Sequence, residues 1–103
     1  MVFLYLTTRG WKTGRDHEIE IWFTELEGVY FVIAEKLERT HWVQNLRREP
    51  AVLFRVVEKN FEGTARVLDE PADAARAARA RALSDKKYGW SGGLVVELRP
   101  RER

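Results

Sequence analysis

The sequence contains no cysteine, and this absence removes several kinds of chemistry at once. Without a thiol, the chain can form no disulfide, no thiolate nucleophile and no cysteine-ligated metal site. Histidine is also scarce, because His17 and His41 are the only two, and neither has carboxylates at the spacing of a metal site. We therefore predict no bound metal.

Serine is almost as rare, and this limits the catalytic groups that the chain can offer. Ser84 and Ser91 both lie in a segment without the pattern of a nucleophile elbow. Glu18 and Glu20 share a strand face, but simple alternation explains them as carboxylates that face solvent. We assign no catalytic residue, so an enzyme built on this chain would need a bound cofactor to carry the reaction.

Long apolar runs are absent as well. None approaches the roughly 18 residues of a membrane span, and the sequence begins without a cleavable signal pattern. We therefore expect a cytoplasmic protein with no membrane span. The 18 Lys and Arg against 16 Asp and Glu give a net charge of +2, too weak to indicate nucleic acid. With 45% apolar residues, the 103 residues are expected to form a single domain, 1–103.

Alternating or continuous apolar segments predict six strands. The clearest alternation runs over residues 17–24, where apolar side chains share one face and mostly polar ones the other. Short connections between most of the strands favour an antiparallel order, which is typical of a small closed or partly split barrel. The predicted strands cover residues 2–6, 17–24, 29–34, 51–57, 61–68 and 94–98.

Two segments change to a helical period. Residues 39–49 carry an apolar stripe, and Pro50 ends this helix because the residue before proline avoids the α region. Residues 71–83 form an alanine-rich helix that begins at a proline, and a polar loop is predicted over 84–93. The predicted fold class is mainly β (α+β): a six-stranded antiparallel split β-barrel with two short helices.

The segment with the most distinctive composition is residues 7–15, between the first two predicted strands. It holds two glycines, three hydroxyls and three cations, with no acid before Asp16. Glycine allows the backbone to approach a ligand closely, and unpaired turn amides can converge on an anion beside Lys12. Two interpretations fit these residues: a phosphate-binding loop, or an ordinary solvated hairpin turn.

Two longer motifs include this loop and the first predicted helix. Residues 6–14 read Leu-Thr-Thr-Arg-Gly-Trp-Lys-Thr-Gly, and residues 42–50 read Trp-Val-Gln-Asn-Leu-Arg-Arg-Glu-Pro. The first resembles the LTTxGRKSG loop of the deazaflavin-dependent nitroreductase family, and the second resembles that family's WxxNLxxxP helix. The similarity runs in order from about residue 3 to residue 100, nearly the whole chain.

The resemblance implies the split β-barrel shared with the pyridoxamine-phosphate oxidases, which bind FMN and are usually dimeric. It implies the deazaflavin F-420 as cofactor, with FMN as the alternative, and a phosphate held by the Lys-Thr-Gly part of the loop. Tyr88 is a candidate lid over the cofactor ring, or a simple packing residue. The residues that the resemblance assigns to the cofactor are Lys12, Thr13, Gly14, Arg15, His17, Trp42 and Asn45.

The activity implied by this resemblance is that of an oxidoreductase. Hydride would pass from the reduced deazaflavin to an electron-poor small molecule such as a nitro compound, a quinone or an activated alkene. The alternative is an FMN-binding split-barrel protein or a flavin reductase-like enzyme. A remote alternative is a small-barrel nucleic-acid binder that stacks bases on Trp11, Tyr88 and Trp90. The balanced charge argues against it, so we predict no nucleic-acid partner.

A homodimer is also expected. The predicted strands 2–6, 29–34 and 51–57 are apolar on both faces, yet the interior of one small barrel covers only one face of each. Large exposed apolar patches usually mark an interaction site. A second copy of the chain is the partner that would cover the other face.

Overall fold

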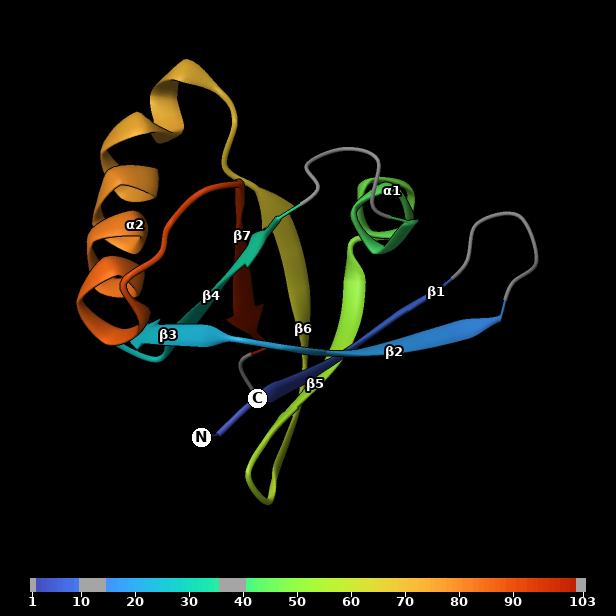
Figure 1. Cartoon of the computed structure of the whole chain (residues 1–103). Coiled ribbons are helices and arrows are strands. Elements are labelled where there is room, and N and C mark those ends of the chain that lie inside the picture. The colour runs from blue at the N-terminus through green and yellow to red at the C-terminus, as the bar shows by residue number, and fades with distance from the viewer. Residues whose placement is uncertain (1, 10–14, 36–40, 102–103) are drawn as a thin grey trace.

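The computed structural model describes residues 2–9, 15–35 and 41–101. Over these residues the chain forms one seven-stranded antiparallel sheet and two α-helices (Figure 1). The strands are β1 Leu4–Arg9, β2 Asp16–Ile21, β3 Phe23–Leu26, β4 Val29–Ala34, β5 Ala51–Val56, β6 Lys59–Val67 and β7 Leu94–Pro100. The helices are α1 His41–Arg48 and α2 Ala74–Tyr88, and a short 3-10 helix, Pro71–Asp73, leads into α2.

The two edges of the sheet are consecutive parts of one chain segment. The strand order is β2-β1-β5-β6-β7-β4-β3, and only Trp22 separates β2 from β3 (Figure 1). The sheet curls into a split barrel because this bent segment pairs with β1 at one end and with β4 at the other. The sequence predicted one strand over 17–24 and six strands in all. A segment that changes partners must bend where one ladder ends, so Trp22 divides the predicted strand into two.

Part of the loop predicted at residues 7–15 is a β-strand in the structure. Its first three residues continue β1 and pair with β2, so their assignment to a loop was wrong. Threonine suits the pleated surface of a strand, and the side chain of Thr8 is fully buried. The residues predicted to hold a phosphate lie outside the described residues: Lys12, Thr13 and Gly14.

Helix α2 is longer than the sequence predicts, because it continues through Tyr88 instead of ending near residue 83. Gly89 ends the helix in the left-handed conformation, with φ of 72°, which glycine adopts without steric cost. Ser84 does not stop the helix, because its hydroxyl donates to the carbonyl of Trp90 at 2.5 Å. The loop predicted over 84–93 is therefore wrong for its first half.

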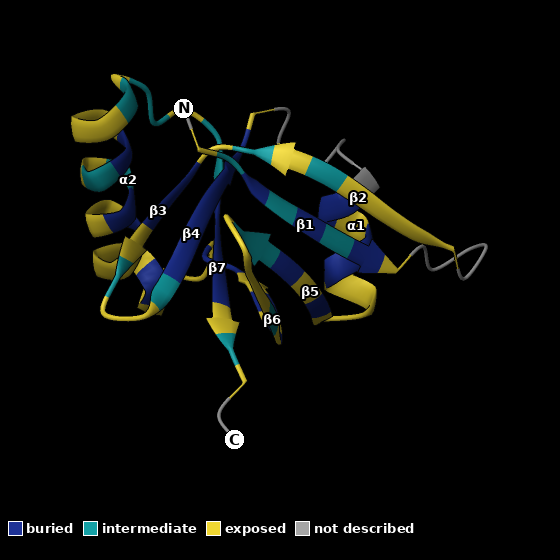
Figure 2. Cartoon of the chain, turned by 90° about the horizontal axis from the view of Figure 1, so that it is seen from below, coloured by how far each residue is buried: buried dark blue, intermediate teal, exposed yellow. Residues whose placement is uncertain are grey.

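Two apolar clusters lie on opposite faces of the sheet. Figure 2 shows where the buried positions fall along the strands and helices. The larger cluster fills the curl of the barrel, where α1 packs against β1 and β6. The smaller one lies under α2 and consists of Phe31, Ile33, Leu68, Ala77, Ala80 and Val95. Helix α2 therefore covers the outer side of β4, one of the strands that the sequence shows to be apolar on both faces.

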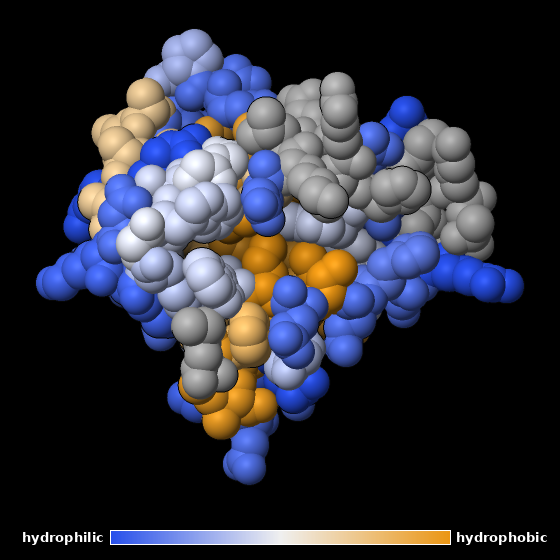
Figure 3. All heavy atoms as spheres, viewed as in Figure 1, coloured by the Kyte–Doolittle hydropathy of each residue, from blue (hydrophilic) through white to orange (hydrophobic). Residues whose placement is uncertain are grey.

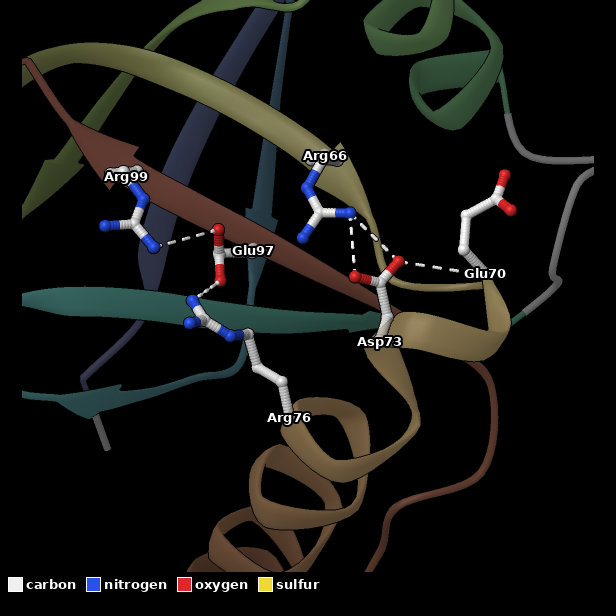
Figure 4. Close-up of polar contacts among 6 residues, drawn as sticks. All are labelled: Arg66, Glu70, Asp73, Arg76, Glu97 and Arg99. Carbon is white, nitrogen blue, oxygen red and sulfur yellow. Dashed lines mark hydrogen bonds and ion pairs between the residues drawn. The ribbon is translucent and has the colours of Figure 1, made fainter.

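Buried carboxylates fix α2 to the sheet (Figure 4). Glu97 of β7, whose side chain is 6% exposed, accepts hydrogen bonds from Arg76 of α2 at 2.5 Å and from Arg99 at 3.4 Å. Asp73, just before α2, accepts one from Arg66 of β6 at 2.9 Å. Separating the members of a buried ion pair is costly, because it leaves an uncompensated buried charge. These contacts therefore hold the helix at one position on the sheet.

The turn between β5 and β6 contains a strained residue. Val57 and Glu58 form this two-residue turn, and Val57 has φ of 56° with 62% of its side chain exposed. The left-handed conformation costs roughly 1–2 kcal/mol for a residue with a Cβ, and a β-branched one rarely adopts it. We expect Val57→Gly to raise the free energy of unfolding by roughly 0.5–1 kcal/mol in urea denaturation, after the added freedom of the unfolded chain is subtracted.

Glu58→Gly is the matched control for this substitution. Among the described non-glycine residues, only Glu27 and Val57 have positive φ, so Glu58 has no strain to release. We expect this control to lower stability by roughly 0.5–1 kcal/mol, because glycine only adds freedom to the unfolded chain. Equal losses of stability in the two variants would show that Val57 is not strained.

Candidate functional site

A cavity of about 660 Å³ opens beside the bend between β2 and β3. Its walls come from β2, β3, β4, the start of α1, and the end of α2 with the segment that follows it. Figure 3 shows hydrophobic surface on this face, between α1 and α2. Aromatic side chains dominate the lining and include Trp22, Phe23, Phe31, Trp42, Tyr88 and Trp90. A mostly apolar hollow of this size is the usual form of a small-molecule site.

Trp42 lies in the wall of this cavity at the start of α1. Its side chain is 7% exposed and also belongs to the core inside the barrel. Trp42 shares the cavity with Tyr88 and Trp90, which are more than forty positions further along the chain. The structure therefore places Trp42, which the resemblance assigns to the cofactor, beside Tyr88, the candidate lid, and Trp90. Their contact with a cofactor stays a prediction.

Asn45 lies one helical turn further along α1 and has a different environment. It is 5% exposed, and its Nδ2 donates to the hydroxyl of the buried Thr8 at 3.3 Å. This hydrogen bond joins the two motifs on which the resemblance depends, because Thr8 belongs to the first and Asn45 to the second. Asn45 is not among the described residues that line the cavity. The contact holds α1 against the end of β1, and a role for Asn45 in cofactor binding stays a prediction.

Two other predicted cofactor residues, Arg15 and His17, lie at the opposite end of β2 from the cavity. His17 is exposed near the start of β2, and Arg15 is exposed just before the strand. Six residue steps separate Asp16 from Trp22, or about 20 Å at the roughly 3.3 Å rise of a strand. Strand β2 thus begins with exposed polar and charged residues and ends beside the cavity.

Tyr88 makes contacts that a free lid would not make. Its hydroxyl donates to the carbonyl of Phe23 at 2.8 Å and accepts from the amide of Phe23 at 3.2 Å. Its ring stacks on Trp22, with centroids 4.5 Å apart and planes inclined by 10°. Lys87 also donates to the carbonyl of Phe23, at 3.0 Å. Tyr88 therefore braces the backbone where the segment leaves one ladder and enters the next.

The sequence analysis assigned no role to Trp22 or to Lys87. A signal for Trp22 was present, because a large aromatic side chain is unusual on the polar face of an alternating segment that carries Glu18 and Glu20. For Lys87 there was no such signal, since a lysine near the end of a helix is common. Its contact with Phe23 depends on how α2 packs against β3.

The curled sheet, with both edges on one bent segment, defines the chain as a split β-barrel protein. A family model described as F420H2-dependent quinone reductase matches residues 1–90. The chain therefore belongs to this family, in which F420H2 denotes the reduced deazaflavin cofactor. The protein is accordingly an oxidoreductase that uses the deazaflavin, and the fold, the family relationship and the cofactor predicted from the sequence are confirmed.

Solved structures share the fold at low sequence identity. An F420-H2 dependent reductase, FDR-A, is 24% identical over 93% of this chain and 92% of its own, with a TM-score of 0.63. A conserved hypothetical protein from Mycobacterium tuberculosis is 20% identical over 97% and 73%, with a TM-score of 0.77. The heme storage protein HutZ from Vibrio cholerae is 16% identical over 98% and 82%, with a TM-score of 0.78. No curated protein matches the chain.

Two of the negative expectations concern membranes and metals. No helix within the described residues is long and apolar enough to cross a membrane. The described part of the chain also holds no group of three or more His, Asp or Glu side chains arranged to bind a metal ion. The cytoplasmic location stays a prediction.

Removing the hydroxyl of Tyr88 tests whether its hydrogen bonds to the backbone of Phe23 stabilise the fold. Tyr88→Phe removes the hydroxyl and both of its hydrogen bonds but keeps the ring that stacks on Trp22. We expect the free energy of unfolding to fall by about 1–2 kcal/mol, because the partly buried backbone groups lose a partner. Urea denaturation of the purified variant measures this loss.

Lys87→Met is the comparison for this variant. It removes the other donor to the carbonyl of Phe23 while the Tyr88 hydroxyl stays in place. We expect a loss below about 0.5 kcal/mol, since the carbonyl keeps a partner and the lysine is exposed. If Tyr88→Phe were as stable as the parent chain, the brace would have no energetic role.

Proposed function

We propose that the chain binds the reduced deazaflavin along β2 and transfers hydride to an electron-poor small molecule in the cavity beside Trp22. A quinone is the first candidate acceptor, and nitro compounds and activated alkenes follow. One observation carries this proposal: an aromatic cavity that includes Trp42 lies at the far end of β2 from Arg15 and His17, which follow the predicted phosphate-binding residues in the sequence. A cofactor with a phosphate at one end and a flat ring at the other needs two such separated sites.

The residues present suit a cofactor of this kind. The cavity of about 660 Å³ lies within the range of roughly 300–1,000 Å³ that is usual for small-molecule sites. Trp42, Ile19 and Ile21 offer apolar walls for a flat ring system. The loop that precedes β2 carries Lys12 and two glycines, which suit a phosphate.

In this proposal the bound deazaflavin supplies the hydride, and the protein supplies position and environment. The phosphate would be held by Lys12, Thr13 and Gly14, with Arg15 and His17 nearby. The aromatic walls would exclude water from the reacting atoms, which strengthens the electrostatic interactions inside the site. A binding site that fixes two flat reactants against each other lowers the barrier through orientation alone.

An activity assay with several electron-poor compounds tests which of them accepts the hydride. Purified protein with the reduced deazaflavin would be given equal concentrations of a naphthoquinone, a nitroaromatic compound and an activated alkene. We expect the highest kcat/KM with the quinone. No oxidation of the deazaflavin above the rate without enzyme, with any of the three, would overturn the proposed activity.

FMN is the alternative cofactor, because it also carries a single phosphate and a flat ring. A thermal-shift panel with FMN and the deazaflavin F-420 separates the two. We expect the larger rise in melting temperature with the deazaflavin, since ligands that bind only the folded state stabilise it. A larger shift with FMN would favour the flavin-binding alternative.

We infer that residues 1–103 act as one binding domain and that the chain forms a homodimer. The sequence argument for a homodimer is wrong for β4, because α2 covers the outer side of that strand. It still applies to β5, where Leu53 is 50% exposed, and the adjoining Val57 is 62% exposed. An exposed leucine on the face of a sheet, with an exposed valine in the turn that follows the strand, supports pairing with a second copy.

The proposed phosphate site gives a direct prediction. A charge-assisted hydrogen bond contributes roughly 1.5–3 kcal/mol, so Lys12→Ala is expected to weaken binding of the deazaflavin by about 10- to 100-fold. Isothermal titration of the parent and variant proteins measures both dissociation constants. Because Lys12 belongs to none of the strands or helices predicted from the sequence, we expect the variant to stay folded.

Arg79→Ala is the control, because Arg79 is an exposed cation on α2, far from the loop in the sequence. We expect its dissociation constant to match that of the parent protein. Equal affinities in the parent protein and Lys12→Ala would show that the loop is an ordinary turn. The phosphate site would then lie elsewhere.

A further inference from the structure

The outer face of the sheet covers β2, β1, β5, β6 and the end of β7. Exposed carboxylates lie along one edge of this face, and exposed arginines lie along the other. Along one edge, β2 presents the exposed Asp16, Glu18 and Glu20, which we call the acidic edge. Along the other, the end of β7 presents the exposed Arg99 and Arg101, which we call the basic edge. The two edges of this face therefore carry charges of opposite sign.

The register of the strands shows how these edges are connected. Glu18 pairs with Thr7, Thr7 pairs with Leu53, and Leu53 pairs with Glu62. The amide of Arg101 then donates to the carbonyl of Glu62 at 2.7 Å. One continuous row thus runs from the acidic edge to the basic edge, with Leu53 of β5 at its centre.

The two edges are too far apart to neutralise each other within one chain. Four strand spacings of roughly 4.8 Å place them about 19 Å apart along the sheet. This exceeds the screening length of about 8 Å at physiological ionic strength. Within the chain, Asp16 lies 3.9 Å from Arg9, and Arg99 lies 3.4 Å from Glu97. The exposed Glu18 and Arg101, at the two ends of the row, are therefore the charges that we expect to meet a partner with the opposite arrangement.

We propose that this face binds a second copy of the chain about a two-fold axis parallel to β5 at Leu53, so that each acidic edge meets the other copy's basic edge. The inference rests on the homodimer proposed above. A two-fold interface uses the same surface on both copies, so a face with opposite charges on its two edges can complement itself. Leu53 of each copy would lie at the axis, where its exposed side chain becomes buried.

Charge decides between the two axes that could relate such faces. An axis parallel to the strands exchanges the edges, so that Glu18 of one copy meets Arg101 of the other. An axis across the strands places each edge opposite the same edge of the other copy, so that Glu18 meets Glu18 and Arg101 meets Arg101. Like charges facing each other disfavour an interface, which selects the parallel axis.

The charged groups nearer the axis are arranged differently from those at the two edges. The parallel axis places Glu62 of β6 opposite Thr7 of β1 in the other copy. Arg9 lies two positions further along that strand, 3.9 Å from Asp16 of its own chain.

Arg55 lies on β5 two positions from Leu53, so the parallel axis places it near Arg55 of the other copy, and it stacks over the ring of Tyr5 at 4.3 Å. The pKa of Tyr5 is raised because its hydroxyl donates to Glu20, so a carboxylate lies close to this cation.

The surface is also shaped to accept side chains from a partner. Two hollows of about 810 Å³ and 1040 Å³ open on it, and Thr7, Leu53 and Glu62 line both. Apolar contact at the centre would provide much of the affinity, because exposed ion pairs are individually weak. The charged edges would fix the orientation of the two copies.

Charge reversal at the two ends of the Leu53 row tests the proposal. The variants are Glu18→Lys, Arg101→Glu, and the double variant with both changes in one chain. Each single change turns two attractive contacts of the dimer into repulsive ones, so we expect the dimer dissociation constant to rise about tenfold or more. The double variant restores opposite charges at both contacts and is expected to return close to the parent value.

Light scattering and sedimentation at several protein concentrations measure these constants at low salt. Lys86→Glu on α2 is the matched control, because this exposed lysine lies off the face, and we expect no change. Far-ultraviolet circular dichroism and urea denaturation check that each variant folds, as the exposed positions of Glu18 and Arg101 lead us to expect.

The possible outcomes separate this inference from the homodimer on which it rests. A monomeric parent chain would overturn both. A dimeric parent whose dissociation constant is unchanged by either single reversal would overturn only the arrangement, because the axis across the strands pairs like charges before and after the change. Weakening in both single variants without recovery in the double variant would also contradict the paired edges.

Discussion

The backbone of Phe23 is the point on which the rest of this structure depends. One chain segment supplies both edges of the sheet, so its hydrogen bonds must pass from β1 to β4 at the single residue Trp22. A partly buried amide and carbonyl at such a break need other partners, since unpaired backbone groups are costly. Tyr88 supplies a donor and an acceptor at once through its hydroxyl.

This brace also determines where the candidate site lies. Because Tyr88 is the last residue of α2, its bond to Phe23 brings the end of the helix, and Trp90 after it, to the bend. Trp42 approaches the same place from α1, whose position is set by the hydrogen bond between Asn45 and Thr8. The cavity is thus a product of two helices held to one strand segment by buried polar contacts, with the ion pairs of Glu97 as support.

Much of this could be predicted from the sequence, but not all of it. Alternation placed the strands, Pro50 ended the first helix near its observed end, and the two motifs identified the family. The break at Trp22 escaped prediction because alternation continues across it, and only a change of pairing partner reveals it. The end of α2 was placed too early because Ser84 is a polar residue inside a helix, and its bond to Trp90 is a tertiary contact.

The sequence by itself determined the type and order of the elements, because periodicity, prolines and turn residues act over a few neighbouring positions. It also determined the family and the cofactor through two short motifs. Only the tertiary structure decided that Tyr88 braces a strand and that α2 covers the outer side of β4. It alone showed that the exposed charges gather on two opposite edges. These features depend on contacts between residues far apart in the chain, which no local pattern encodes.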